Sequence, residues 1–112
     1  MKIVRFDDSP TFAPKGHEGV LNHALVSTEW HDTPAVGVWW GRFDDGGASN
    51  LHIHIGATQV YVVLAGTFVV DDGETEYRLN ARDTAIIGPD EPHRIRAEGD
   101  AEVMVVTTPG LR

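Results

Sequence analysis

The chain has 112 residues, a formal net charge of −8 at pH 7 and no cysteine. This length suits a single domain, and a hydrophobic fraction of 41% predicts a packed core rather than disorder. The negative charge disfavours nucleic acid and anionic membrane surfaces as partners, and the lack of cysteine excludes disulfides and thiolate metal ligands. Any metal site must therefore use His, Gln, Asp or Glu side chains.

No targeting or membrane-spanning segment is evident. The apolar start of the chain is interrupted by Arg5 and ended by Asp7 and Asp8, so it lacks the core of a signal peptide. The longest apolar run, Val60 to Val70, is much shorter than the roughly 20 residues of a membrane helix. We therefore expect a cytoplasmic protein with no membrane partner.

Short stretches rich in Val, Ile, Thr and aromatic residues recur along the chain, separated by Gly, Pro and Asp-Gly turns. This pattern is typical of an all-β domain. In chain order the strand candidates are Lys2–Phe6, Val20–Ser27, Ala35–Phe43, Asn50–Ile55, Gln59–Leu64, Thr67–Val70, Thr75–Leu79, Thr84–Ile87, His93–Arg96 and Val103–Thr107. About ten short strands in so small a domain predict a barrel or jelly roll, which leaves few exposed edges.

The first part of the chain is less regular than the rest. We expect residues 1–34 to form an arm or strands that contribute to the barrel or to a dimer, and residues 35–112 to form the barrel core of one domain. Three histidines in this part, His17, His23 and His31, show no ligand spacing and are interpreted as surface residues. His23 is the best placed of them to line a cavity, because it falls within a strand candidate.

The segment from Leu51 to Ile55 alternates strictly between aliphatic residues and histidine. Successive side chains of a strand point to opposite faces, so His52 and His54 share one face and both imidazoles can reach one metal ion. Gln59 opens the next strand candidate, and its side chain can turn toward the same space.

These residues resemble the first motif of the cupin superfamily. That motif has a Gly, five residues, His-x-His, three or four residues, a Glu, six residues and a Gly. The chain has Gly46, His52, His54, Gln59 and Gly66 at these spacings, and the single departure is Gln in place of Glu.

A second stretch resembles the other cupin motif, in which a Gly-Asp pair, a short strand and a Pro-containing turn precede one His. The chain supplies Asp83, the strand candidate Thr84–Ile87, the turn Gly88–Pro92 and His93. It departs from the motif at Arg82, which replaces the Gly, at Gly88, which replaces the usual Pro, and at Ala97, which replaces the trailing Asn.

The resemblance covers roughly residues 36–107 and implies the cupin double-stranded β-helix, a jelly-roll barrel. It also implies one divalent metal ion on His52, His54, Gln59 and His93. Three imidazoles suit Fe(II), Zn, Ni, Mn or Cu about equally. Two alternatives stay open: Gln59 either binds the ion directly or hydrogen-bonds to a water on it, and a metal-free cupin would use the histidines only to line a polar cavity.

Strand alternation indicates the residues around such a site. Trp40, Arg42, Tyr61 and Met104 are interpreted as cavity-lining residues, and Tyr61 is the one candidate for a catalytic proton shuttle. Trp39 and Trp40 are adjacent and must face opposite ways, so one lines the core or cavity and the other contacts a dimer partner or the arm.

Three functions fit this interpretation. The preferred one is a non-haem iron dioxygenase acting on a small enolisable or anionic substrate chelated to the metal, because no carboxylate is expected inside the barrel. The second is a metal-dependent isomerase or lyase acting on a sugar acid or other carbonyl compound. Pectin-degradation cupins resemble the chain in size and in having Gln at the fourth ligand position, although their His-to-Gln spacing is one residue shorter. The third is a non-enzymatic, ligand-binding cupin. The resemblance also implies a homodimer.

The Gln has an electrostatic consequence. A Glu would compensate part of the ion's charge, whereas three neutral imidazoles and an amide leave it uncompensated. We therefore expect such a site to favour an anionic chelating ligand.

Overall fold

The computed structural model describes all 112 residues, and almost all of its regular structure is β-strand. The elements in chain order are η1 (Phe6–Asp8), β1 (Thr11–Phe12), β2 (His17–Val26), α1 (Thr28–His31), β3 (Gly37–Ser49), β4 (Thr58–Asp71), β5 (Glu76–Leu79), β6 (Thr84–Ile87) and β7 (Arg94–Thr108). The predicted all-β class is therefore confirmed. Neither short helix is long and apolar enough to cross a membrane.

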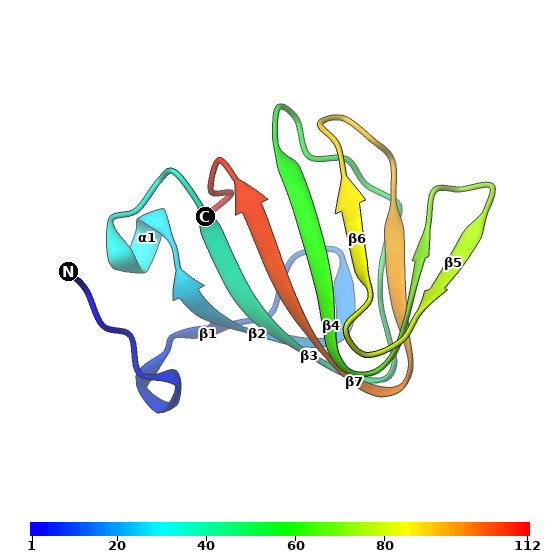
Figure 1. The fold of residues 1–112 in the computed structure, drawn as a ribbon, viewed down its shortest axis with the longest axis horizontal. Coiled ribbons are helices and arrows are strands. Elements are labelled where there is room, and N and C mark those ends of the chain that lie inside the picture. Colours follow the sequence, from blue (N-terminus) through cyan, green and yellow to red (C-terminus); the bar gives the residue numbers. More distant parts are fainter.

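All strand pairs are antiparallel, and the order across the sheet is β1-β2-β3-β7-β4-β5, with β6 also paired to β4. The three longest strands, β3, β4 and β7, lie side by side and curve together (Figure 1). After its bend, β7 pairs with the first half of β3 and with the first half of β4. Before the bend, β7 pairs with the last residues of the same two strands. Each long strand therefore contributes to two facing walls, as in a jelly roll.

Glycines make the sharp bends between these two walls. Gly66 interrupts the register of β4 with β7 and has φ +82°. A Cβ atom at this position would overlap with the carbonyl oxygen of Asp100 on β7. The bend thus needs both a left-handed backbone and a residue without a side chain, and only glycine meets both needs.

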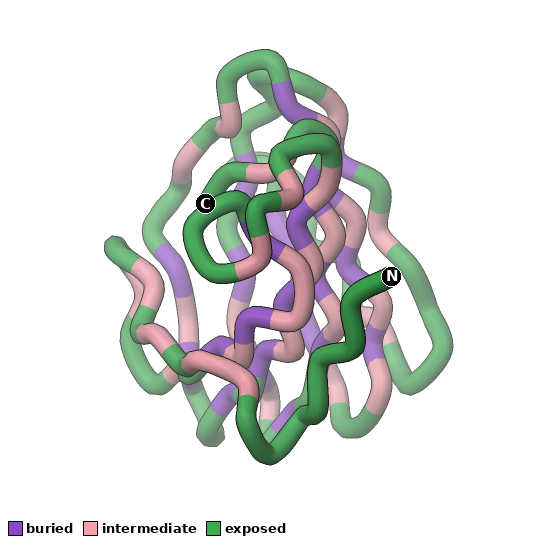
Figure 2. Tube along the Cα trace, turned by 90° about the vertical axis from the view of Figure 1, so that its left-hand side faces the viewer, coloured by how far each residue is buried: buried purple, intermediate pink, exposed green.

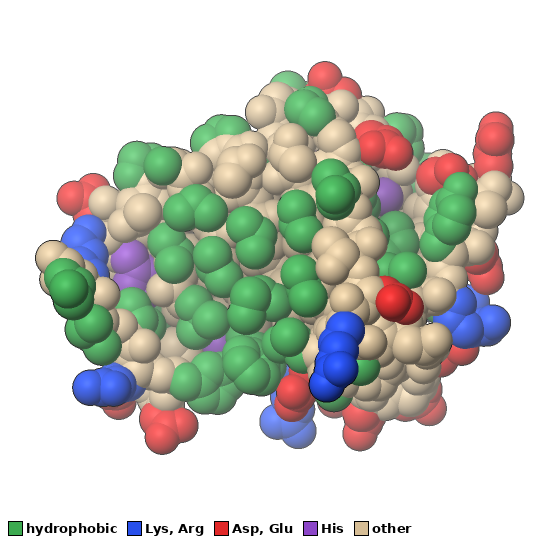
Figure 3. Space-filling view, in the orientation of Figure 1, with side chains coloured by type: hydrophobic (Ala, Val, Ile, Leu, Met, Phe, Trp, Pro, Cys, Tyr) green, Lys and Arg blue, Asp and Glu red, His purple; other side chains and the backbone are tan.

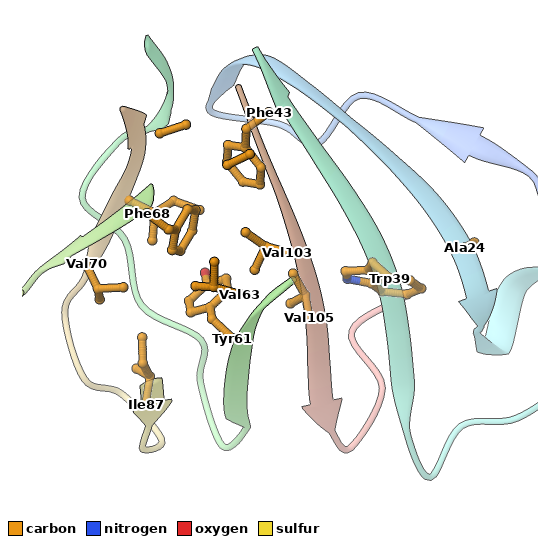
Figure 4. Packing of buried hydrophobic residues seen from close by; sticks show 13 residues of the cluster. Ala24, Trp39, Phe43, Tyr61, Val63, Phe68, Val70, Ile87, Val103 and Val105 are labelled. Atoms are coloured by element: carbon orange, nitrogen blue, oxygen red, sulfur yellow. The ribbon is translucent and has the colours of Figure 1, made fainter. Parts of the chain in front are cut away.

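The core lies between the two walls. Thirteen buried hydrophobic residues form one cluster, to which β4 and β7 contribute most members. Figure 4 shows Phe43 and Val103 from one wall facing Phe68 from the other. Phe43 and Phe68 pack edge to face with ring centroids 5.1 Å apart. The burial pattern alternates along the strands (Figure 2), as expected when one face of each wall is inside.

Six strand candidates differ from the structure. Lys2–Phe6 forms no strand, and its exposed residues lie outside the sheet. Asn50–Ile55 makes only an isolated bridge. Two candidates lie within the continuous strand β4, and two lie within β7. In each strand the pairing continues on both sides of a glycine bend, at Gly66 in β4 and at Gly99 in β7.

The N-terminal part joins the sheet. Strand β2 pairs with β3 from His17 to Val26. Before it, the ring of Phe6 stacks on His23 at 4.4 Å and lies 5.1 Å from the Trp40 ring, so the start of the chain covers part of the outer sheet face.

Candidate metal centre

Three histidines from two separate segments converge at one end of the barrel interior. His52 and His54 lie between β3 and β4, and His93 immediately precedes β7. One ring nitrogen from each of the three lies within 4.8 Å of the others. The ring centroids are 4.3 Å apart for His52 and His93, 4.8 Å for His52 and His54, and 5.3 Å for His54 and His93.

Backbone pairing brings the two segments together. His52 and His93 form an isolated antiparallel bridge, in which each backbone N–H donates to the other residue's carbonyl at 2.9 Å. The alternation around His54 survives without a full strand: Leu51, Ile53 and Ile55 are exposed, whereas the histidines are partly or fully buried. One local bridge therefore sets the spacing of the imidazoles.

Backbone carbonyls also fix the tautomers of two of these rings. Nδ1 of His52 lies 2.7 Å from the carbonyl oxygen of Asn50, and Nδ1 of His93 lies 2.9 Å from that of Glu91. A carbonyl can only accept, so both Nδ1 atoms carry the hydrogen, and in the neutral ring the lone pair is on Nε2. Fixing one ring nitrogen in this way is how proteins commonly orient a histidine toward a metal.

Gln59 completes the group as a neutral oxygen donor. Its side chain is buried, and its Oε1 atom accepts a hydrogen bond of 2.8 Å from the hydroxyl of Tyr61. The same oxygen lies 3.0 Å from Nε2 of His93. With Nδ1 of His93 protonated, these two atoms are both acceptors. A cation beside them satisfies both; without one, the amide must turn to donate its N–H.

His54 provides the clearest sign that a group is needed here. Its Nε2 atom is buried and has no hydrogen-bond partner. Burial, assisted by the neighbouring His52 and His93 and opposed by the side chain of Gln59, lowers the pKa of His54 to about 4. Burial likewise lowers the pKa of His93. The rings of His54 and His93 are therefore neutral at pH 7, which is the form that binds a metal, and the residues present fit a divalent cation.

Tyr61 lies beside this group and lines the cavity. Its side chain is 2% exposed, and burial strongly raises the pKa of its hydroxyl. A hydroxyl that is buried, bonded to Gln59 and hard to ionise is suited to holding that amide in place rather than to exchanging protons.

Three other residues interpreted as cavity-lining lie elsewhere. Trp40 and Met104 pair across β3 and β7 on the outer face, and Arg42 is exposed on the same face of β3. Their neighbours Trp39 and Val105 line the cavity instead. Alternation correctly separates the two faces of a strand, but it does not say which face is inside.

His17 is a site residue that sequence reasoning missed. It lines the cavity together with His52, His54 and Gln59, and its ring centroid lies 5.7 Å from that of His52. The other two N-terminal histidines lie outside this cavity: His23 packs on Phe6, and Nδ1 of His31 lies 3.0 Å from the Ser27 hydroxyl.

Comparison with known proteins gives one family and a consistent fold. A model of the cupin domain matches residues 39–109. No curated protein is significantly similar to the chain in sequence.

Three solved structures illustrate the range of similar folds. A predicted oxalate decarboxylase from Thermotoga maritima has a TM-score of 0.81 and 24% identity, with 96% of this chain and 99% of that chain covered. KdgF from Halomonas sp. has a TM-score of 0.73 and 21% identity, with 92% and 90% covered. Ectoine synthase from P. lautus has a TM-score of 0.83 and 15% identity, with 99% and 80% covered. At these identities the likeness concerns the fold, and it confirms the jelly roll predicted from the two motifs.

Proposed function

Because the chain belongs to the cupin domain family, we propose that it is a metal-dependent enzyme whose divalent ion is held by His52, His54 and His93, with Gln59 as a fourth donor. The observation that carries this proposal is the convergence of three imidazoles, one of which has a buried nitrogen without a partner. A bound ion would supply Lewis acidity and a place for a chelating ligand.

The substrate we propose is a small enolisable or anionic molecule. All four protein donors are neutral, so the ion's positive charge would be available to an anionic ligand. The remaining cavity wall is largely aromatic and aliphatic, with Phe12, Trp39 and Phe43 among its members. Such a wall suits a compact organic molecule with its oxygen atoms at one end.

The reaction we favour is a non-haem iron dioxygenase reaction, with molecular oxygen as the second substrate. No Asp or Glu is among the residues that line the cavity, so carboxylate acid–base chemistry has no candidate there. Three or four protein donors would leave coordination positions on Fe(II) for a chelating substrate and for oxygen.

A metal-dependent isomerase or lyase acting on a sugar acid or other carbonyl compound is the second candidate. The observation in its favour is His17, which places an additional imidazole in the cavity beside the proposed metal ligands. An imidazole can act as a proton acceptor near neutral pH, as such reactions require.

One experiment separates these proposals. The protein is purified without added metal, its metal content is measured, and oxygen uptake is followed after Fe(II) loading with a panel of 1,3-diketones and catechols. We expect bound divalent metal in the parent, little in His93→Ala, and substrate-dependent oxygen uptake only in the Fe(II)-loaded parent. Zinc or nickel without oxygen uptake would favour the isomerase or a ligand-binding protein over the dioxygenase. No retention of any divalent cation would contradict the metal site itself.

We also propose that the protein is a homodimer formed through the outer face of the sheet. Two rows of apolar side chains cross this face at paired positions of neighbouring strands. One row consists of Val26, Val38, Val106, Val60 and Ile86, and the other of Trp40, Met104 and Val62. Figure 3 shows hydrophobic side chains gathered over this face. A contiguous apolar face of this kind is typical of an interface, and a two-fold pairing would cover it on both copies.

A further inference from the structure

His17 reaches the cavity through an irregularity in β2. Ala24 and Asn22 are buried on the inner side of this strand, so counting back by twos would place Glu18 inside and His17 outside. The register with β3 shifts between Glu18 and Val20, and Gly19 has φ +64°. This bulge adds one residue, so His17 lines the cavity and Glu18 is exposed.

The Gly19 bulge is built into the packing of β2 on β3. A Cβ atom at Gly47 would overlap with the carbonyl oxygen of Gly19, and one at Gly19 would lie 3.1 Å from the Cα atom of Gly47. Two glycines thus allow the backbones to approach closely where the strand changes face. The orientation of His17 is therefore set by the sheet and not by a mobile loop.

The ring of His17 is held in a defined tautomer. Its Nδ1 atom lies 2.8 Å from the carbonyl oxygen of Lys15, so Nδ1 carries the hydrogen. The neutral ring then offers a lone pair on Nε2. The same arrangement, with a carbonyl two residues earlier in the chain, orients His52 and His93.

His17 nevertheless stands apart from the three proposed ligands. The group of ligand atoms that lie within 4.8 Å of one another comprises His52, His54 and His93 only. The ring of His17 contacts that of His52 in this group, with the two centroids 5.7 Å apart. A side chain that lies beside the ion without binding it can contact a molecule that is bound to the ion.

A second polar side chain on the same strand faces this space. Asn22 is 6% exposed and lines the cavity, and none of the side-chain hydrogen bonds in the structure involves its amide. Its amide is thus free to bond with a water molecule or a ligand in the cavity. The β2 side of the cavity thus offers an acceptor at His17 and an amide at Asn22 to a polar ligand.

We propose that His17 is a substrate-binding residue that accepts a hydrogen bond from a hydroxyl group of a ligand held at the metal, so that the site selects hydroxy acids or hydroxycarbonyl compounds over simple carboxylates. This inference rests on the proposed metal site and specifies the substrate class for it. The hydroxyl is the group that the Nε2 lone pair can recognise, and a carboxylate without a hydroxyl offers it no donor.

The test compares glycolate with acetate, which share a carboxylate and differ in one hydroxyl. The full chain is loaded with Co(II), and binding of each anion is followed by the visible spectrum of the ion. In His17→Phe we expect glycolate to bind about three- to tenfold more weakly, the range for losing one hydrogen bond. Acetate and Co(II) itself should bind within twofold of the parent. His17→Gln retains an acceptor and should recover most of the glycolate affinity.

His31→Phe is the matched control, because it makes the same exchange at a histidine outside the cavity and should change neither anion. If His17→Phe does not fold by circular dichroism, His17→Leu takes its place. Equal weakening of both anions, or no weakening, overturns the inference. A tenfold loss of Co(II) affinity in His17→Phe also overturns it, because His17 would then be a metal ligand. A parent chain that does not bind Co(II) refutes the proposed metal site, and this inference with it.

Discussion

The Nε2 atom of His93 lies 3.0 Å from the Oε1 atom of Gln59, so a ring nitrogen and an amide oxygen from two separate segments meet at the site. His93 gives its Nδ1 hydrogen to the carbonyl of Glu91, and the Gln59 oxygen already accepts from Tyr61. Two acceptors at this distance need a cation beside them, or the amide must turn to donate its N–H. Residue 59 is thus the position at which a single side chain sets the charge of the site.

The first prediction concerns that charge. Gln59→Glu places a carboxylate beside the three imidazoles, so we expect Zn(II) to bind at least tenfold more tightly. We expect oxalate to bind at least fivefold more weakly to the loaded protein, because the added negative charge opposes it at short range. Zn(II) affinity is measured by competition with a chromophoric chelator, and oxalate affinity by calorimetry on the loaded protein.

The control for this variant is Gln59→Met, which has similar size and no charge. We expect it to weaken Zn(II) binding and to leave the preference for anions unchanged. If Gln59→Glu binds oxalate as tightly as the parent does, the neutral amide is not the reason for any anion preference.

The second prediction is a pH dependence of stability in the metal-free protein. The pKa of His54 is lowered from 6.5 to about 4, chiefly by burial. Between these values the unfolded chain binds a proton that the folded chain does not, so the free energy of unfolding falls as the pH drops. Because His54 is partly exposed, we expect its share of the loss to be about 1–2 kcal/mol. Burial lowers the pKa values of His17 and His93 as well, and these act in the same direction.

Urea denaturation in EDTA at pH 7.5, 6.5, 5.5 and 4.5 measures this dependence. His54→Gln should show a smaller loss over the same range. Hydrogen bonds and Arg partners lower the pKa values of Asp71 and Glu98, so these carboxylates lose their contribution only at still lower pH. A free energy of unfolding that is constant from pH 6.5 to 4.5 would contradict the burial of neutral imidazoles.

The three histidines of the site could be predicted because their signal is local and chemical. His52 and His54 alternate with aliphatic residues, and His93 follows a Pro-containing turn at the spacing of a known motif. The structure brings them together through one backbone bridge between His52 and His93. That bridge keeps the alternation of the segment even though no full strand forms there.

His17 could not be predicted in the same way, because its orientation depends on a bulge in the pairing of two strands. Gly19 alone does not reveal a bulge; the close approach of Gly47 on β3 produces it. The misplacement of Trp40 and Met104 has a related cause. Around Trp40 and Met104 both faces of β3 and β7 are apolar, and Phe6 covers part of the outer face there. Alternation at these positions then has no polar side chain to mark the outside.

The third prediction tests the bend at Gly66. Gly66→Ala adds a methyl group against the carbonyl oxygen of Asp100 at a residue with φ +82°. We expect it to lower the free energy of unfolding by about 3 kcal/mol or more, from backbone strain and steric overlap together. Gly46 is the matched position, because it has φ +77° and open space where the methyl group would be. Gly46→Ala should cost only about 1–2 kcal/mol. Equal losses in urea denaturation would show that the approach to β7 is not what requires glycine at residue 66.

The fourth prediction tests the proposed dimer. Met104 lies at the centre of the outer face, on β7 and between Trp40 and Val62 on the flanking strands. Met104→Lys buries an ammonium group in the interface if two copies pair there, and an unpaired buried charge is strongly unfavourable. In light scattering after gel filtration we expect the parent at twice the 12.2 kDa chain mass and the variant at the chain mass. Glu74→Lys is the control, because it introduces the same charge at an exposed turn residue and should leave the dimer intact. A parent that elutes as a monomer, or a Met104→Lys dimer as stable as that of Glu74→Lys, would show that this face is not the interface.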